Sequence, residues 1–308
     1  MQISRQELIF EIVRKALMDC FAANGSTLAL CDEPLQLFHS PVATLIKEEI
    51  VKTGRKLWER QYVDGNGGNI SARLSTKYVI CTPTLCSKAD LCIEDLSLID
   101  MENRQIIGSR PQSSEMLLHL QIYRTVPRAN AVIHCHPPYA TAHAIAGIVP
   151  QGNLVPEQEV FVGPLALTPY ETPGTIEFAR TILPIVKQHN TILLANHGVV
   201  CWADTVTHAE WYVEVVDTYC KTVMIASQLK SPLPEIPPNK IADLLAIKQR
   251  LGLPDARLPL PSDRIAELEQ AVAESNCSSF SMQSKKAEID QLITSLAAQI
   301  SAFIEKRA

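Results

Sequence analysis

The sequence predicts an α/β domain built on a substantial sheet, with helical segments at both ends of the chain. Between about residues 42 and 230, helical periodicity alternates with short apolar runs, which is the pattern of an α/β core. The composition, 46% hydrophobic and 20% charged, is that of an ordinary globular enzyme. The segment KSPLPEIPPNK, which contains four prolines, then indicates a linker, and only helical patterns follow it.

These patterns divide the chain into three expected parts. Residues 1–41 are an N-terminal amphipathic helix, over 4–22, with a linker; residues 42–230 are the central domain; residues 231–308 are a proline-rich linker and a helical extension. In the central domain we predict helices near 42–61, 114–126, 138–146, 174–188 and 205–229, and strands near 69–74, 77–81, 97–100, 131–136, 160–168 and 191–195. After the linker we predict helices near 239–251, 263–275 and 284–306.

Charge and cysteine content exclude several classes of protein. The formal net charge of -5 argues against a nucleic-acid binder, which shows a basic stripe. No apolar run approaches the roughly 20 residues that span a bilayer. Glu7 and Glu11 interrupt the apolar pattern of the N-terminus, so we do not expect a signal peptide. Nine cysteines without CxxC pairs indicate free thiols in a reducing compartment, and hence a cytoplasmic location.

Two motifs place histidines at the ends of predicted strands. In AVIHCHPPYATAHA, alternation along the strand puts His134 and His136 on one face and Cys135 on the other. In TILLANHGVV, Gly198 permits a sharp turn that holds His197 at the end of another strand. Three histidines with an open coordination position are the arrangement of a catalytic zinc site. The alternatives are a surface strand end that carries two histidines and a plain turn residue at the third.

Two further motifs carry polar side chains. In SSEMLLHLQIYR, Ser113 or Ser114 can cap a helix that begins near Glu115, whose carboxylate is either an acid/base or a plain capping group. His119 lies on the same helix face, and we expect it to pack or to support the site. The motif GNGGNIS, residues 65–71, can expose backbone N–H groups to an anion, or it is only a turn that enters a strand.

Together with ICTPT and TPYETPGT, these motifs occur in an order that resembles the class II aldolase/adducin superfamily, over roughly residues 42–230. The resemblance implies a three-layer α/β/α catalytic domain with a mostly antiparallel central sheet, to which the sequence pattern adds helical extensions at both ends of the chain. It implies that Zn2+ is bound by His134, His136 and His197, and that Glu115 is the acid/base. It also implies a set of residues that bind the substrate phosphate: Gly68, Asn69, Thr84, Ser113 and Ser114.

The sequence departs from the family pattern at two places. Leu85 stands where the phosphate loop usually has glycine, and a side chain there can obstruct the approach of a phosphate. Lys88 is a candidate to supply charge instead, unless it is a solvated surface lysine. In VPEQEVFVG the chain has Glu157 and Glu159 near the position of the family's catalytic tyrosine, and Glu157 is our candidate for the second acid/base.

The resemblance implies a zinc-dependent aldolase that cleaves a ketose 1-phosphate such as L-fuculose 1-phosphate through an ene-diolate. An epimerase, decarboxylase or dehydratase on the same scaffold is the alternative, and a non-catalytic adducin-like interaction protein is another. The resemblance further implies a homotetramer, and the apolar pattern of 205–229 is broader than one buried face requires. Residues 1–22 are also a candidate for docking to the protein shell of a bacterial microcompartment, the alternative being packing on the chain's own core.

Overall fold

The computed structural model describes residues 34–258, so the helices predicted over 4–22, 263–275 and 284–306 lie outside the described residues. The helical elements are α2 (Pro34–Phe38), α3 (Pro41–Glu59), η2 (Ile93–Asp95), α4 (Met116–Thr125), α5 (Pro138–Ala146), the π-helix η3 (Gln158–Val162), α6 (Ile176–Arg180), α7 (Val206–Leu229) and α8 (Pro238–Arg250). The strands are β1 (Asn69–Arg73), β2 (Tyr78–Cys81), β3 (Ser97–Asp100), β4 (Gln105–Ile107), β5 (Ala131–Cys135), β6 (Ala166–Thr168), β7 (Thr191–Leu194) and β8 (Gly198–Ala203).

The strands form one sheet in the order β4-β3-β2-β1-β5-β8-β7-β6. All neighbours are antiparallel except β6 and β7. In the middle of the sheet, His134 of β5 pairs with Asn69 of β1 on one side and with Val200 of β8 on the other. The expected mostly antiparallel sheet is confirmed, and its central strands carry the residues of the histidine and glycine motifs.

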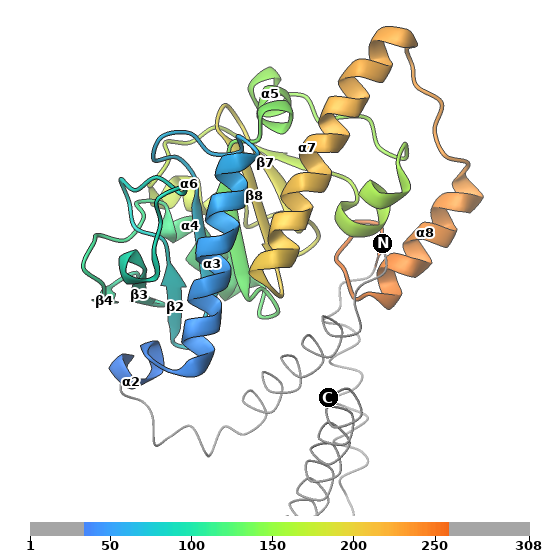
Figure 1. Cartoon of the computed structure of the whole chain (residues 1–308). Helices are drawn as coiled ribbons and strands as arrows, with labels where there is room; N and C mark the ends of the chain where they lie inside the picture. Colours follow the sequence, from blue (N-terminus) through green and yellow to red (C-terminus); the bar gives the residue numbers. More distant parts are fainter. Residues whose placement is uncertain (1–33, 259–308) are drawn as a thin grey trace, which may run out of the picture. The chain divides into compact units, whose positions relative to one another are not determined.

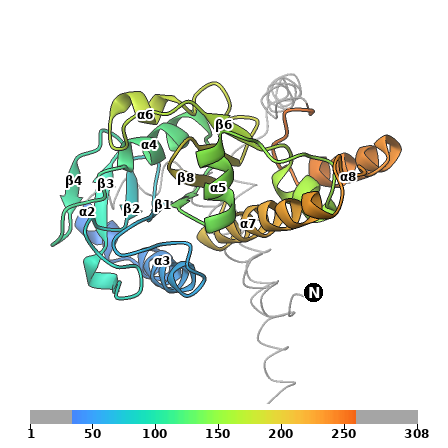
Figure 2. The same cartoon turned by 90° about the horizontal axis from the view of Figure 1, so that it is seen from above.

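Helices cover both faces of this sheet. Figure 2 shows α4 and α6 on one side and α3 and α7 on the other, and Figure 1 shows α3 and α7 side by side across the sheet. The side chains of β5 follow this division, because Ala131, Ile133 and Cys135 belong to the apolar cluster under α3 and α7. Val132 belongs to the cluster under α4 and α6. The three-layer α/β/α arrangement is confirmed, and Cys135 faces away from His134 as alternation requires.

The structure differs from the predicted elements in a few places. The strand predicted over 160–168 is divided into η3 and the short β6, because Gly163, with φ 80, and Pro164 separate the two. The helix predicted over 174–188 has α-helical geometry only to Arg180. Strand β8 was not predicted, since a turn of three residues joins it to β7.

Beyond the predicted linker, α8 packs on η3. Within residues 34–258, no helix is long and apolar enough to cross a membrane. The domain boundaries at residues 41 and 230 stay predictions.

Candidate functional site

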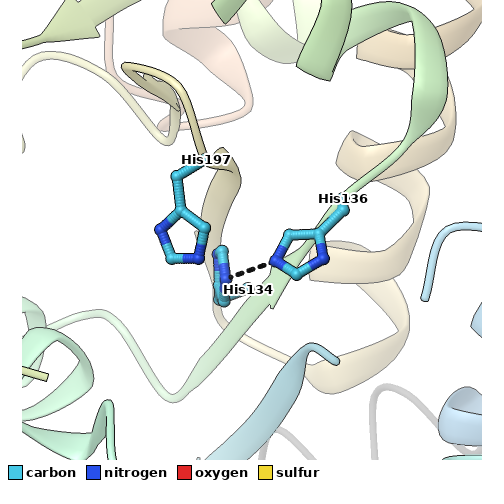
Figure 3. Close-up of side chains that lie close together, drawn as sticks. All are labelled: His134, His136 and His197. Carbon is cyan, nitrogen blue, oxygen red and sulfur yellow. Dashed lines mark hydrogen bonds between the residues drawn. The ribbon is translucent and has the colours of Figure 1, made fainter. Parts of the chain in front are cut away.

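Three histidines from neighbouring strands meet at one end of the sheet. His134 lies in β5, His136 follows the last residue of β5, and His197 lies in the turn between β7 and β8. The potential ligand atoms of the three side chains all lie within 4.8 Å of one another, and Figure 3 shows the rings gathered around a common centre. The structure therefore brings together the three residues that the two sequence motifs singled out.

The contacts of His134 fix its tautomer. Its Nδ1 lies 2.9 Å from the carbonyl oxygen of Val199, which can only accept, so Nδ1 carries the proton and donates. In the neutral ring this leaves a lone pair on Nε2, which lies 3.1 Å from His136 Nε2. Burial, together with the neighbouring His197 and His136, holds the pKa of His134 well below its usual range. The ring is thus neutral and presents a ligand atom to the centre.

The set of donors suits a divalent metal ion. Ligands about 2.0–2.1 Å from a tetrahedral zinc lie roughly 3.3 Å from one another, and the two Nε2 atoms of His134 and His136 are 3.1 Å apart. Burial lowers the pKa of His197 as well, which favours its neutral, metal-binding form. One histidine also has a carboxylate neighbour on its other ring nitrogen, because Asp64 Oδ1 lies 3.6 Å from His136 Nδ1. Sequence reasoning missed Asp64, although it directly precedes the glycine motif.

Two glycines make room for the ring of His136. A Cβ on Gly67 would lie 3.3 Å from His136 Cε1, and one on Gly198 would lie 2.7 Å from His136 Cδ2 and 2.5 Å from the carbonyl oxygen of Cys135. We expected Gly198 to supply the sharp turn before β8. The left-handed residue of that turn is instead Asn196, with φ 54, and Gly198 is required because no side chain fits between β8 and β5.

The carboxylate of Glu115 points at the histidines. Its Oε2 lies 3.3 Å from His134 Nε2, and its Oε1 lies 3.5 Å from His197 Nε2. Asn69 Nδ2 donates a hydrogen bond to Oε2 at 2.8 Å. Glu115 stands at the N-cap position of α4, but its side chain makes no capping hydrogen bond. The side chain therefore does not cap the helix by a hydrogen bond, and its carboxylate faces the histidines, while its acid/base role stays a prediction.

The glycine-rich loop borders the histidines, and Lys88 lies beside it. Gly68 has φ 69, and a Cβ there would lie 3.0 Å from the carbonyl oxygen of His134. The Lys88 side chain is buried, and its Nζ donates to the carbonyl oxygens of Cys86, at 3.0 Å, and Asn66, at 3.4 Å. Burial lowers the pKa of Lys88 to about 8. Lys88 is thus not a solvated surface lysine but a buried cation against the loop.

Leu85 adopts a backbone conformation that favours glycine. Its φ is 52, in the left-handed region, and its side chain is 76% exposed. The side chain extends into solvent, and whether it obstructs a phosphate stays a prediction. The same loop is tied to the serine motif, since Thr84 N donates to Pro111 O at 2.9 Å and Ser113 N donates to Thr82 O at 3.2 Å.

A segment between β6 and α6 also borders the site. A Cβ on Gly174 would lie 3.3 Å from the carbonyl oxygen of Ser114, which is exposed, whereas Ser113 is buried. The ring centroid of Phe178 lies 5.5 Å from that of His197. Sequence reasoning missed Phe178, although the motif TPYETPGT placed a turn just before it.

The two glutamates of VPEQEVFVG have different surroundings. Glu159 is buried and forms an ion pair with Arg257 at 2.8 Å, and it accepts a hydrogen bond from Asn153 N at 2.7 Å. Glu157 is exposed at the start of η3. Within residues 34–258, no hydrogen bond joins Glu157 to the histidine cluster, so its role as the second acid/base stays a prediction.

Curated proteins similar to this chain have two different activities in their names. The chain is 36% identical over 158 residues to the 3-oxo-tetronate 4-phosphate decarboxylase of Haemophilus influenzae, which covers 50% of this chain and 75% of that protein. It is 34% identical over 183 residues to the L-fuculose phosphate aldolase of Methanococcus maripaludis, covering 59% of this chain and 98% of that protein. Both similarities include the central part of the chain and neither reaches its full length.

Solved structures of proteins with related names also resemble this chain. YgbL from Escherichia coli superimposes with a TM-score of 0.61 at 27% identity, covering 66% of this chain and 99% of that chain. An L-fuculose 1-phosphate aldolase superimposes with a TM-score of 0.61 at 25% identity, covering 68% of this chain and 97% of that chain. The family model described as the class II aldolase and adducin N-terminal domain matches residues 48–224, which include all three histidines and Glu115. The chain belongs to the class II aldolase and adducin family.

Proposed function

We propose that this protein is a zinc-dependent lyase that breaks a carbon–carbon bond next to the carbonyl group of a phosphorylated substrate. The reaction that we place first is the cleavage of a ketose 1-phosphate, such as L-fuculose 1-phosphate, into dihydroxyacetone phosphate and an aldehyde. The observation that carries the proposal is the Glu115 carboxylate, which lies 3.3 Å from His134 Nε2 and 3.5 Å from His197 Nε2.

The three histidines would hold the metal ion through ring nitrogens. When bound, a zinc ion supplies a Lewis acid that polarises the substrate carbonyl and stabilises the negative charge of an ene-diolate. The chain's own contribution is to keep these rings neutral and oriented. Val199 O fixes the tautomer of His134 by accepting from its Nδ1, and Gly67 and Gly198 leave space for the ring of His136.

Glu115 is the proposed acid/base. In the aldol cleavage, the bond between C3 and C4 breaks, its electron pair stays on C3, and C4 becomes the aldehyde as its hydroxyl loses a proton. Glu115, which must carry a proton at the start of this step, then donates it to C3, which gives dihydroxyacetone phosphate. Asn69 Nδ2 orients this carboxylate, and the buried Oδ1 of Asn69 has no partner among the described residues, which leaves it available to a substrate hydroxyl.

A second group must take the proton of the C4 hydroxyl, and Glu157 is our candidate. It is exposed at the start of η3, so it can act only if this part of the surface borders a substrate site. The resemblance of the motifs implies a homotetramer with sites at subunit contacts, and such a contact would bring the exposed Glu157 to a site. Exposed apolar side chains on α7, among them Trp211, Ile225 and Leu229, support burial of this helix in an oligomer.

The names of the relatives favour decarboxylation of a 3-oxo acid phosphate as a second candidate. Loss of CO2 from such an acid leaves the electron pair of the broken C1–C2 bond on C2, next to the carbonyl. Protonation of C2 by Glu115 then gives dihydroxyacetone phosphate, through the same ene-diolate. This reaction needs no base for a hydroxyl group, so it does not require Glu157.

We propose that the phosphate group binds between two loops. The candidates on the glycine-rich loop are Gly68 and Asn69, and those on the neighbouring segments are Thr84, Lys88, Ser113 and Ser114. Lys88 supports this placement, because the contacts of its ammonium group are with carbonyl oxygens rather than with a carboxylate. A buried cation that has no carboxylate partner among residues 34–258 favours an anionic ligand nearby.

The test is to supply L-fuculose 1-phosphate and 3-oxo-tetronate 4-phosphate to the zinc-loaded protein and to measure dihydroxyacetone phosphate, aldehyde and CO2. In whichever of the two reactions the protein catalyses, Glu115→Gln should lower turnover by about 10²- to 10⁴-fold, because glutamine cannot carry the proton. Glu177→Gln, which changes an exposed glutamate on α6, is the matched control. Zinc-loaded protein that produces no carbon–carbon cleavage, or Glu115→Gln with full turnover, would contradict the proposal.

Docking of residues 1–22 to a shell protein stays a proposal about a segment outside the described residues. A fusion of residues 1–22 to a fluorescent protein tests it by co-purification with shell proteins. Light scattering of the full chain tests the tetramer, and a fully active monomer would contradict it.

A further inference from the structure

A row of buried polar contacts joins one face of β1 to one side of α4. Alternate residues of a strand share a face, and residues four apart share a side of a helix. On β1 the row consists of Asn69, Ser71 and Arg73, and along α4 and its N-cap it consists of Glu115, His119 and Tyr123.

The contacts follow the chain in register. Asn69 meets Glu115 at 2.8 Å. One step along β1 and one turn along α4, Ser71 Oγ lies 2.7 Å from His119 Nδ1. Ser71 Oγ also lies 2.8 Å from the Tyr123 hydroxyl.

At the far end, Arg73 closes the row. Its Nη2 donates to the carbonyl oxygen of Tyr123 at 2.7 Å, and its guanidinium lies 4.9 Å from the centre of the Tyr123 ring. These contacts attach the last turn of α4 to the end of β1, so the row extends over the whole length of the helix.

The middle of this row lies in a dry environment. The side chains of Ser71, His119 and Tyr123 are buried. Around them, apolar residues such as Met116 and Val132 fill the space between α4 and the sheet. Burial lowers the pKa of His119 to about 3, so its ring is neutral. Polar groups in such a place are unfavourable unless they are paired in defined positions.

Apolar packing alone defines the position of a helix along the strands beneath it only weakly, because leucine, isoleucine and methionine side chains adapt to small shifts. Hydrogen bonds are directional, so a row of them selects one position. Glu115 stands at the start of α4, and its distance from the histidines depends on that position. A displacement of about 1 Å in a catalytic group can reduce the rate on the order of 10²-fold.

We propose that Ser71 and His119 are positioning residues that fix the position of α4 along β1 and thereby hold Glu115 beside the three histidines. This inference rests on the acid/base function proposed for Glu115. Ser71 and His119 act through Glu115, so their contribution to turnover should disappear when Glu115 can no longer transfer a proton.

A double-mutant cycle tests this with the full-length, zinc-loaded protein. Ser71→Ala should lower kcat by about 10- to 100-fold, with KM and metal content unchanged. In the Glu115→Gln background, the same change should alter kcat by less than about 2-fold, although it lowers Tm by the same few degrees in both backgrounds. Thr191→Val, which removes a buried hydroxyl from β7 outside the row, is the matched control and should leave kcat unchanged.

A second variant and a second readout keep the outcome decisive. His119→Asn keeps a polar atom toward Ser71 and should retain more activity than His119→Leu. If Ser71→Ala does not fold, His119→Asn takes its place in the cycle. A crystal structure of the serine variant without metal should show α4 displaced along β1. Equal kcat losses in both backgrounds, or an unmoved α4 with unchanged turnover, would overturn the inference. If Glu115→Gln alone leaves turnover intact, the acid/base function fails, and the crystal structure then decides whether the row positions α4.

Discussion

Lys248 is the charged centre of the contact between α8 and η3, and replacing it by methionine should lower the free energy of unfolding by about 2–3 kcal/mol. The Lys248 and Asp255 side chains are fully buried, and Nζ lies 3.3 Å from Asp255 Oδ2. Nζ also donates to Glu159 O at 3.3 Å. Methionine has a similar length, so the change removes the charge and both contacts while it fills most of the space.

The magnitude follows from what remains after the change. Removing one partner of a buried ion pair costs about 3–5 kcal/mol when the other charge is left alone. Asp255 is not left alone, because Arg257 donates to it from Nε at 2.8 Å and from Nη2 at 2.9 Å, so we expect a smaller loss of about 2–3 kcal/mol. Asp255→Asn is expected to cost more, about 3–5 kcal/mol, because it leaves Lys248 and Arg257 without the carboxylate between them.

Urea denaturation followed by tryptophan fluorescence measures these losses, at one protein concentration because association adds to apparent stability. Lys240→Met is the matched control on the same helix. Its ion pair with Asp243 is exposed, and pairs of this kind contribute about 0–1 kcal/mol. The reasoning is refuted if Lys248→Met is as stable as the unmodified protein, or if the control loses as much.

Three further outcomes are expected. His134→Ala should reduce bound zinc, about one per chain in the unmodified protein, and full metal content by elemental analysis would contradict the assignment. Gly198→Ala should lower both metal content and Tm, because the added Cβ would lie 2.7 Å from His136 Cδ2; an unchanged protein would show that β8 can move. Burial, assisted by Glu210, raises the pKa of Glu214 to about 7. Between pH 4.5 and 7 the unfolded chain then releases a proton that the folded protein retains, so stability should fall as pH rises, and Glu214→Gln should flatten that decline in thermal melts at a series of pH values.

The local pattern of the sequence determined most of the helices and the central strands. Amphipathic periodicity located α3, α4 and α7, and alternation at the end of β5 put His134 and Cys135 on opposite faces. These features depend on residues a few positions apart, whose relative directions are fixed by backbone geometry. The short motifs around His134, His136 and His197 therefore identified the histidine cluster from the sequence alone.

Where backbone geometry did not fix the outcome, the sequence was a weaker guide. The apolar run of 160–168 was equally compatible with a strand, and the glycine and proline inside it divided it into η3 and β6. The residue type of Leu85 shows neither its left-handed φ of 52 nor the exposure of its side chain.

Only the tertiary structure decided what each charged side chain meets. The spacing of Glu115 allowed a helix cap or an acid/base, and the fold places its carboxylate against Asn69 from β1 and two histidines from other strands. The sequence left Lys88 either as a charge for the site or as a solvated surface lysine, and the fold buries it against the carbonyl oxygens of Asn66 and Cys86. Burial and Coulomb interactions depend on neighbours that are distant in the sequence, so the titration and contacts of these groups are properties of the folded chain.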